Sequence, residues 1–308
     1  MKLKSRLFGF VLILLGTTGL FAQQRPVTST YMFDGLSLNP AYAGSLNVFS
    51  AVVRNRDQWI NVPGAPVFQS VTAHNSFLSN RVGVGLLMTR DQVGVHEDVG
   101  VYGSYAYKIR TGSGILSMGL QAGFNNLQSN FTETEAFDPT EDLYSNISSF
   151  SPNFGAGLYF ANAQMYVGFS VPYILTNKIY EIETDVPIDS RESRFYYLTG
   201  GVVFDMSALI KLSPGFLIRY QENVPIGWDI NGTVIFEDIA YVGVSYRSGD
   251  AVVFLTQFIL NENFRVGYAY DAITSPLTQY TKGTHEIMIN YRIKLKNHKK
   301  DPQCPVYF

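Results

Sequence analysis

The sequence has 308 residues and a formal net charge of -2, so charge gives it no basis for binding nucleic acid. Its single cysteine, Cys304, excludes an intramolecular disulfide and therefore a small secreted fold held by disulfides. Charged residues make up 16% of the chain and aromatic residues 14%, whereas soluble domains carry about 25% charged residues. This composition favours a membrane environment.

Residues 1–22 are predicted to form a signal peptide for export. Lys2, Lys4 and Arg6 provide a basic start, an apolar stretch runs from Leu7 to Leu15, and Ala22 stands at a suitable cleavage site. The apolar stretch is shorter than the roughly 20 residues that a membrane-spanning helix needs. We therefore expect an exported chain rather than one held by a helical anchor.

Residues 23–47 precede the first predicted strand and include the stretch LSLNPAYAGS at positions 36–45. Pro40 and Gly44 interrupt regular helix or strand in this stretch. The segment is also rich in large apolar side chains, namely Tyr31, Phe33, Leu36, Leu38 and Tyr42. Because such residues favour burial, we expect the segment to plug the lumen or the periplasmic mouth of the fold that follows. The alternative is a flexible tail.

Residues 48–293 are predicted to form one domain, an antiparallel outer-membrane β-barrel. Apolar residues alternate with small or polar ones along segments of about ten residues, which is typical of strands that cross a bilayer in a closed barrel. In FRVGYAYD, for example, Phe264, Val266 and Tyr268 alternate with Arg265, Gly267 and Ala269. The fourteen predicted strands cover residues 48–60, 66–77, 81–91, 97–109, 113–125, 153–161, 164–172, 195–205, 210–221, 226–236, 239–248, 251–260, 263–271 and 283–293. A soluble β-sandwich would also show alternation.

The lengths of the connections favour the barrel over the sandwich. Connections after even-numbered strands are tight, whereas those after odd-numbered strands include the long segments 126–152, 173–194 and 272–282. Outer-membrane barrels sort their connections in this way, with short periplasmic turns and longer extracellular loops. We therefore expect the long loops outside the cell and both termini in the periplasm, including a basic C-terminal tail at 294–308.

Catalytic and cofactor-binding motifs are not evident in the sequence. It has no Gly-x-Ser-x-Gly elbow, no His-Glu-x-x-His and no nucleotide-binding loop, and its four histidines are scattered. His285 beside Glu286 is the best candidate for catalysis, and a structural role for this pair is the preferred interpretation. We expect no enzymatic activity, no cofactor and no metal site.

The order of short motifs resembles the PorP/SprF family of outer-membrane proteins, which is associated with type IX secretion and gliding in Bacteroidota. The matching stretches are YMFDGLSLNPAYAGS and RNRDQWINVPGAP. The residues that carry the match are Tyr31, Asn39, Pro40, Ala41, Ala43, Gly44, Arg56, Gln58, Trp59, Gly64, Ala65 and Pro66. Asp57 departs from the family pattern, because a less acidic residue is expected there.

The resemblance implies a barrel that binds, helps to export or anchors a secreted surface protein, through that adhesin's C-terminal domain. Its partners would be the adhesin, type IX secretion components that include periplasmic ones, and outer-membrane lipid. Two alternatives stay open. One is a core secretion component linked to periplasmic ring and peptidoglycan-binding partners, and the other is a plugged channel for hydrophobic small molecules.

Two groups of functional residues are predicted. Arg56 shares a face of the first strand with Arg54, and an inward arginine needs a carboxylate, so we expect Arg56 to pair with Asp271 or Glu286. The long loops are acidic, and aromatic residues among acidic ones suit a protein-binding rim. The predicted partner-binding residues are Phe137, Tyr144, Phe150, Tyr173 and Tyr180.

Overall fold

The computed structural model describes residues 27–130, 147–182, 188–191, 193–222 and 224–294. The predicted signal peptide lies outside these ranges, as does the tail beyond residue 294. The helices in these ranges are short 3-10 turns, and none of them is long and apolar enough to span a membrane.

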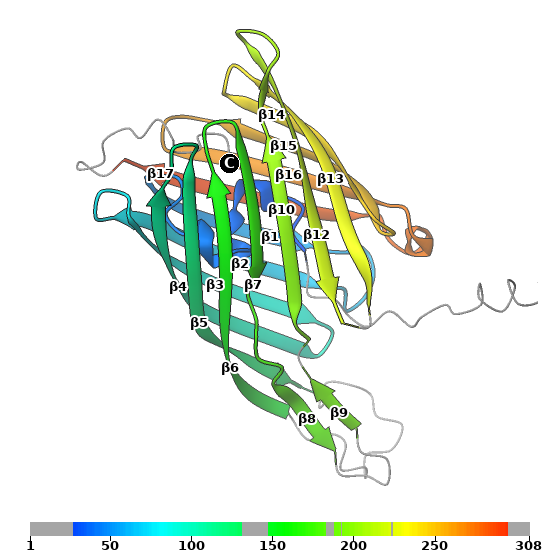
Figure 1. Ribbon diagram of the computed structural model, residues 1–308. Coiled ribbons are helices and arrows are strands. Elements are labelled where there is room, and N and C mark those ends of the chain that lie inside the picture. The colour runs from blue at the N-terminus through cyan, green and yellow to red at the C-terminus, as the bar shows by residue number, and fades with distance from the viewer. Residues whose placement is uncertain (1–26, 131–146, 183–187, 192, 223, 295–308) are drawn as a thin grey trace, which may run out of the picture.

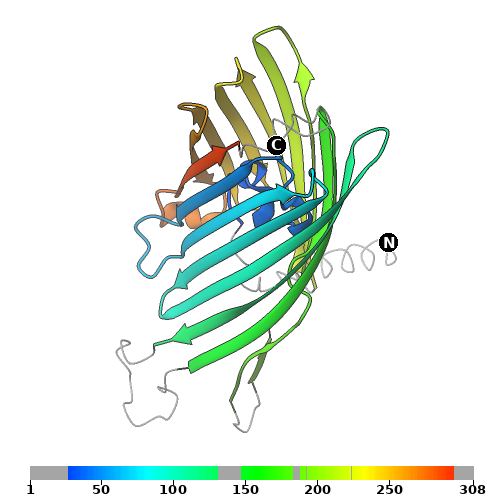
Figure 2. The same ribbon diagram turned by 90° about the vertical axis from the view of Figure 1, so that its left-hand side faces the viewer.

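The chain forms a closed antiparallel barrel of fourteen strands, as the alternating pattern predicted. Each strand pairs with its neighbours along the chain, and β1 closes the barrel against β17 (Figures 1 and 2). The barrel strands are β1 (Phe49–Asp57), β2 (Val67–Phe77), β3 (Val82–Val93), β4 (His96–Arg110), β5 (Ile115–Ser129), β6 (Ile147–Ala161), β7 (Met165–Val171), β10 (Phe195–Val202) with its short continuation β11 (Phe204–Asp205), β12 (Ile210–Gln221), β13 (Val224–Phe236), β14 (Ala240–Arg247), β15 (Ala251–Ile259), β16 (Phe264–Ile273) and β17 (Thr284–Ile293).

Two details of the predicted strands were wrong. The connection expected at 126–152 begins and ends as strand, because β5 and β6 pair as far as Ser129 and Ile147. The connection expected at 173–194 carries an additional hairpin, β8 (Lys178–Ile182) and β9 (Ile188–Arg191), which extends from one rim of the barrel (Figure 1). In both places, polar and turn-forming residues interrupt the sequence, so the alternation of apolar and polar positions is too short to be recognised as a strand.

The two faces of the barrel wall differ in chemistry. Outward residues are large and apolar and remain exposed in the isolated chain, for example Leu120 at 63%, Phe154 at 54% and Ile287 at 52%. Such an exposed apolar band is the surface that a bilayer covers. Aromatic pairs stand on the same outward face, including Trp228 with Tyr246 at 5.4 Å between ring centroids.

The connections divide between the two ends of the barrel. Short turns join β2 to β3, β4 to β5, β6 to β7, β11 to β12, β13 to β14 and β15 to β16, and we call this end the short-turn rim. The opposite end, the long-loop rim, carries the connections at 58–66, 130–146, 172–194 and 274–283. The division that the sequence predicted is therefore present.

A charge placed on the outward face should destabilise the barrel. Leu120 lies in the middle of β5, and replacing it with arginine should lower the free energy of unfolding by about 2–4 kcal/mol, because the guanidinium would enter hydrocarbon. Urea unfolding in lipid vesicles, followed by tryptophan fluorescence, measures this change. Ser113→Arg, in an exposed short turn, is the matched control and should change stability by less than about 0.5 kcal/mol. Equal losses in both variants would contradict the lipid-facing assignment.

Candidate functional site: the N-terminal segment and the charged lumen

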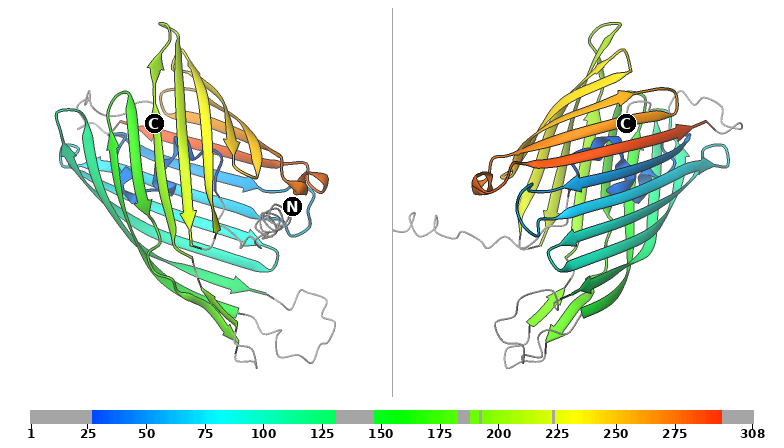
Figure 3. Two further views of the ribbon diagram at one scale, coloured as in Figure 1. Left: turned by 45° about the vertical axis from the view of Figure 1, so that its right-hand side comes forward. Right: turned by 180° about the vertical axis from the view of Figure 1, so that it is seen from behind.

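The described part of the N-terminal segment, residues 27–48, lies inside the barrel (Figures 2 and 3). It forms three 3-10 turns, η1 (Tyr31–Phe33), η2 (Gly35–Ser37) and η3 (Pro40–Tyr42). Its apolar side chains pack on inward residues of the wall, as Phe33 does on Tyr241 and Tyr42 on Tyr159. The five apolar residues that the sequence singled out are all buried, between 1% and 8% exposed.

Asn39 and Pro40 start the last 3-10 turn and attach it to the wall. The Asn39 side chain accepts a hydrogen bond from the Ala41 backbone amide at 2.9 Å, which caps the turn, and Pro40 follows with the backbone torsion that a first helical residue needs. The Asn39 amide also donates to the Leu158 carbonyl of β6 at 2.9 Å. Asn39 therefore both caps its own 3-10 turn and attaches the segment to β6.

Inward glycines of the wall make room for this turn. A Cβ atom added to Gly119 of β5 would overlap the backbone of Ala41, and one added to Gly83 of β3 would overlap the Ala43 carbonyl. Gly157 of β6 would meet the Asn39 side chain in the same way. The small inward residues noted in the sequence are thus the positions where the segment comes closest to the wall.

Gly44 ends the turn with a backbone conformation that favours glycine. Its φ is +67°, and an added side chain would meet the Asn75 carbonyl. The Gly44 amide donates to Nδ1 of His74 at 3.2 Å, and its carbonyl accepts from the Lys108 ammonium. Gly44 is therefore held from two strands, β2 and β4.

The predicted arginine lies in a buried cluster at the β1–β17 seam. Arg56 is 2% exposed and contacts Asp271 at 2.7 Å and Glu286 at 3.1 Å, so the structure brings together all three predicted residues. Arg56 and Glu286 stand directly opposite each other in the register of β1 and β17. Ser29 of the segment completes this group, because its hydroxyl donates to Asp271 at 2.7 Å and its backbone amide donates to Glu286 at 2.7 Å.

Arg54, two residues earlier on the same inward face, is fully buried beside the segment. It contacts Asp34 of the segment at 3.3 Å and Glu286 at 3.3 Å, and its Nε donates to the Thr30 hydroxyl at 3.0 Å. Burial raises the pKa of Asp34, while Arg54 and a hydrogen bond from Thr72 oppose the rise. Sequence reasoning did not name Asp34, although an acidic residue within an apolar buried segment is a signal for such a pair.

The cluster continues around the wall to β12, β13 and β14. Arg247 contacts Asp271 at 3.2 Å and Asp229 at 2.9 Å, and Arg219 contacts the other Asp229 oxygen at 3.0 Å. The connected set thus contains four arginines and four buried carboxylates, so its buried charges balance; the partly exposed Asp250 also contacts Arg247, at 3.8 Å. We call it the central charge cluster; its members are Arg54, Arg56, Arg219, Arg247, Asp34, Asp229, Asp271 and Glu286.

The second family motif forms the connection between β1 and β2 at the long-loop rim. The Gln58 amide donates to the Pro66 carbonyl at 2.9 Å, and the Ala65 amide donates to Val62 at 3.2 Å, which closes the loop on itself. The Trp59 amide donates to the Thr284 hydroxyl at 3.1 Å, and the Gly64 carbonyl accepts from Gly94 at 3.0 Å. This loop therefore ties the barrel seam to the turn between β3 and β4.

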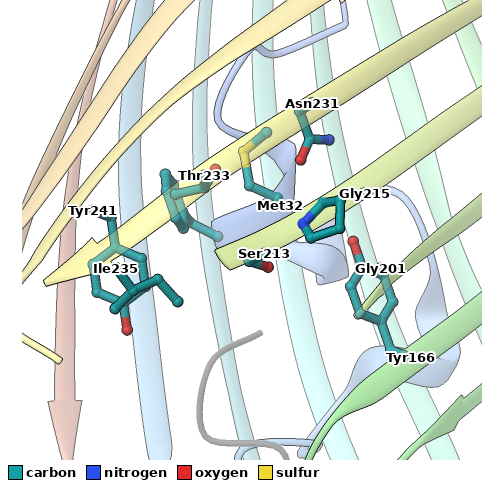
Figure 4. Close-up of a pocket in the computed structure, with 11 residues that line it drawn as sticks. Met32, Tyr166, Gly201, Ser213, Gly215, Asn231, Thr233, Ile235 and Tyr241 are labelled. Carbon is teal, nitrogen blue, oxygen red and sulfur yellow. The ribbon is translucent and has the colours of Figure 1, made fainter. Parts of the chain in front are cut away.

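A small cavity remains between the segment and the wall of β12, β13 and β14. Figure 4 shows Met32 of the segment among the lining residues, together with Asn231, Thr233 and Ile235 from β13 and Tyr241 from β14. The Tyr31 hydroxyl, from the same turn η1, accepts a hydrogen bond from Asn231 at 2.8 Å. The segment is thus anchored on this side as well.

The predicted partner-binding aromatics do not form one group. Phe150 is 65% exposed on the outward face and stacks near Phe124 at 4.9 Å. Tyr173 is buried at 7% against Tyr102, 5.1 Å away, so its assignment to an exposed rim was wrong. Tyr180 lies in β8, but its side chain is outside what the structure describes, as are Phe137 and Tyr144.

His285 and Glu286 are neighbours on β17, and their side chains face opposite sides of the barrel wall. Glu286 is fully buried in the central charge cluster, whereas the His285 ring contacts the Tyr268 hydroxyl at 2.6 Å on the outward face. Within the described ranges, no group of three or more His, Cys, Asp or Glu side chains could hold a metal ion.

A family model described as "Type IX secretion system membrane protein PorP/SprF" matches residues 20–291. The chain belongs to this family. Membership confirms the resemblance carried by the two motifs and makes the protein an outer-membrane component of type IX secretion. No curated protein matches the sequence.

Solved structures with a similar fold are outer-membrane barrels. The CymD monoaromatic hydrocarbon channel is 10% identical with a TM-score of 0.50, over 86% of this chain and 93% of that chain. The Acinetobacter baumannii outer membrane protein Omp33 is 10% identical with a TM-score of 0.47, over 81% of this chain and 100% of that chain. At such identity the likeness to CymD shows the fold alone.

Removing one cation from the central charge cluster should destabilise this PorP/SprF barrel strongly. Arg56→Met leaves Asp271 and Glu286 buried with fewer partners, so the free energy of unfolding should fall by about 3–5 kcal/mol. Urea unfolding in vesicles measures it. Arg90→Met is the control, because the Arg90–Glu97 pair is solvent-exposed and should contribute about 1 kcal/mol or less. A loss as small for Arg56→Met as for the control would contradict the importance of the cluster.

Proposed function

We propose that this PorP/SprF protein is a closed barrel that binds the C-terminal domain of a secreted adhesin at its long-loop rim and helps to export or anchor it. The observation that carries the proposal is the position of residues 27–48 within the lumen, with hydrogen bonds or ion pairs to strands on several sides. A lumen occupied in this way leaves the rims as the surfaces for function. In this proposal the long-loop rim is extracellular and the C-terminal end of β17 is periplasmic, whereas Val27, the first described residue, packs on Phe195 and Tyr197 close to the long-loop rim.

The filled lumen favours a binding role over a channel for hydrophobic small molecules. A barrel of fourteen strands encloses space that must be filled if it is not to conduct. Here the segment occupies it through specific contacts: two wall glycines accommodate its backbone, a third accommodates the Asn39 side chain, and Arg54 pairs with its Asp34. An opening would have to break a buried ion pair and separate a packed interface, which is costly in free energy.

The long-loop rim has the features expected of a protein-binding surface. The β8–β9 hairpin and the connection between β5 and β6 arise there, and both carry mostly acidic sequences, such as Glu133, Glu135 and Asp138 in the latter. Charges of one sign steer a partner of the opposite sign, and exposed aromatic residues such as Phe150 bury area when it docks. The proposal therefore places a basic or calcium-bridged region of the adhesin against this rim.

Conductance tests whether the segment closes the barrel. Deleting residues 28–45 should raise single-channel conductance in planar bilayers several-fold over the full chain, because the lumen would fill with water. Gly119→Val keeps the segment but pushes it from β5, and should also raise conductance. Gly232→Ala is the control, since an added Cβ there meets nothing within 4 Å. Equal conductance in all four proteins would show that the segment does not close the lumen.

Surface display tests the binding rim. Deleting residues 131–145, or the hairpin at 178–191, should leave the barrel folded but reduce the adhesin on the cell surface at least several-fold, with loss to the medium or blocked export. Both deletions spare the paired strands β5, β6 and β7. A Gly-Ser insertion after Gly112, in an exposed short turn of the opposite rim, is the control and should leave display unchanged. Normal display after both deletions would refute binding at the long-loop rim.

A further inference from the structure

A second set of cations lies inside the barrel, away from the central charge cluster and close to the short-turn rim. Arg265 is the second residue of β16, and Arg292 is the last but one of β17. The Arg292 backbone amide donates to the Asn263 carbonyl, in the turn between β15 and β16, at 2.7 Å. Arg265 stands opposite Asn290 in the register, and Arg292 lies two residues further along the same inward face. The three side chains are therefore neighbours on the inner wall.

These side chains lack the partners that balance the central charge cluster. Among the residues that the structure describes, neither Arg265 nor Arg292 has a carboxylate within ion-pair distance or a side-chain hydrogen bond. The buried Nη1 of Arg265 and Nε of Arg292 have no acceptor. Asn290 is 0% exposed, yet both its amide nitrogen and its amide oxygen are unpaired. A fully buried amide with neither atom satisfied is uncommon, because each such group costs free energy.

The surrounding residues offset the positive charge at this position only in part. The two guanidinium groups lie close enough to repel each other, and the Tyr241 hydroxyl lies within range of both. Asp34 is the one carboxylate with an appreciable effect on Arg292, and it is already paired with Arg54. Two partly buried cations with no carboxylate of the described residues in ion-pair contact create a strong attraction for an anion.

We propose that Arg265, Arg292 and Asn290 form a binding site for a small oxyanion, with phosphate or a carboxylate as its ligand chemistry. Guanidinium groups match the geometry of such oxyanions through paired N–H donors, and the Asn290 amide supplies one more donor. The ligand would come from water at the short-turn mouth rather than from a lipid headgroup, because the three side chains face the lumen. This site is independent of the adhesin-binding rim, which lies at the opposite end of the barrel.

Isothermal titration of the full chain with inorganic phosphate tests the site. The protein is kept in an uncharged detergent at constant ionic strength, because exposed charges respond to salt. Saturable binding is expected for the full chain, and binding about tenfold weaker or worse for Arg265→Gln and for Arg292→Gln, since each loses a charged hydrogen bond. Neither arginine has an ion pair to lose, so both variants should fold. Arg90→Gln, at the exposed pair with Glu97, removes the same charge elsewhere and should bind phosphate as the unchanged protein does.

Two results would overturn the proposal. One is no saturable phosphate binding by the unchanged protein, and the other is an equal loss of affinity in Arg90→Gln and Arg265→Gln. The source of the anion is tested by repeating the titration in phosphatidylcholine vesicles with and without phosphatidylglycerol. An unchanged phosphate affinity supports a site open to lumenal water. Loss of phosphate binding in the anionic vesicles would assign the site to lipid headgroups and contradict its lumenal source.

Discussion

The rest of the structure depends on the need to neutralise charges buried inside the barrel. Arg54 and Arg56 enter the lumen from β1 because strand alternation points both inward, and an unpaired buried charge is too costly to persist. Glu286 of β17 and Asp271 of β16 supply part of the negative charge that neutralises them. The remainder comes from the segment, through Asp34 and through backbone and hydroxyl donors at residues 29 and 30 that hold the carboxylates in place.

This arrangement links the seam of the barrel to its opposite wall. Residues 29–34 attach to the strands that close the barrel, whereas Asn39 and Gly44 attach to β2, β4 and β6. Between them lie only short 3-10 turns, so the segment is a compact brace and not a loose chain. The glycines of the wall and the Asn-Pro start of the last turn make this close approach possible.

Much of this architecture follows from local sequence patterns, because alternation, turn length and inward charge are each visible within a few residues. The fourteen strands, the sorting of connections and the partners considered for Arg56 were all accessible in this way. The remainder depends on contacts between distant parts of the chain. Tyr173 is buried because it meets Tyr102 of β4, a contact with no local signal. Asp34 has a local signal, as an acid within an apolar segment, but its partner Arg54 is set by the path of the segment through the barrel. In the sequence, Asn290 is likewise an ordinary polar strand residue; only the structure shows that its amide is buried with neither atom hydrogen-bonded.

The balance of charged residues inside the barrel also differs between its two ends. At the long-loop rim, Asp91 and Asp98 stand opposite each other on β3 and β4, and the nearby connections are acidic in sequence. The central charge cluster, whose strand members stand toward the long-loop ends of their strands, is neutral because its four arginines and four carboxylates balance, while Arg265 and Arg292 leave an excess of positive charge near the short-turn rim. The sequence beyond residue 293 contains four lysines, Lys294, Lys296, Lys299 and Lys300, and one acid, Asp301. Because opposite potentials attract opposite charges, the two ends of one closed barrel are suited to different ligands.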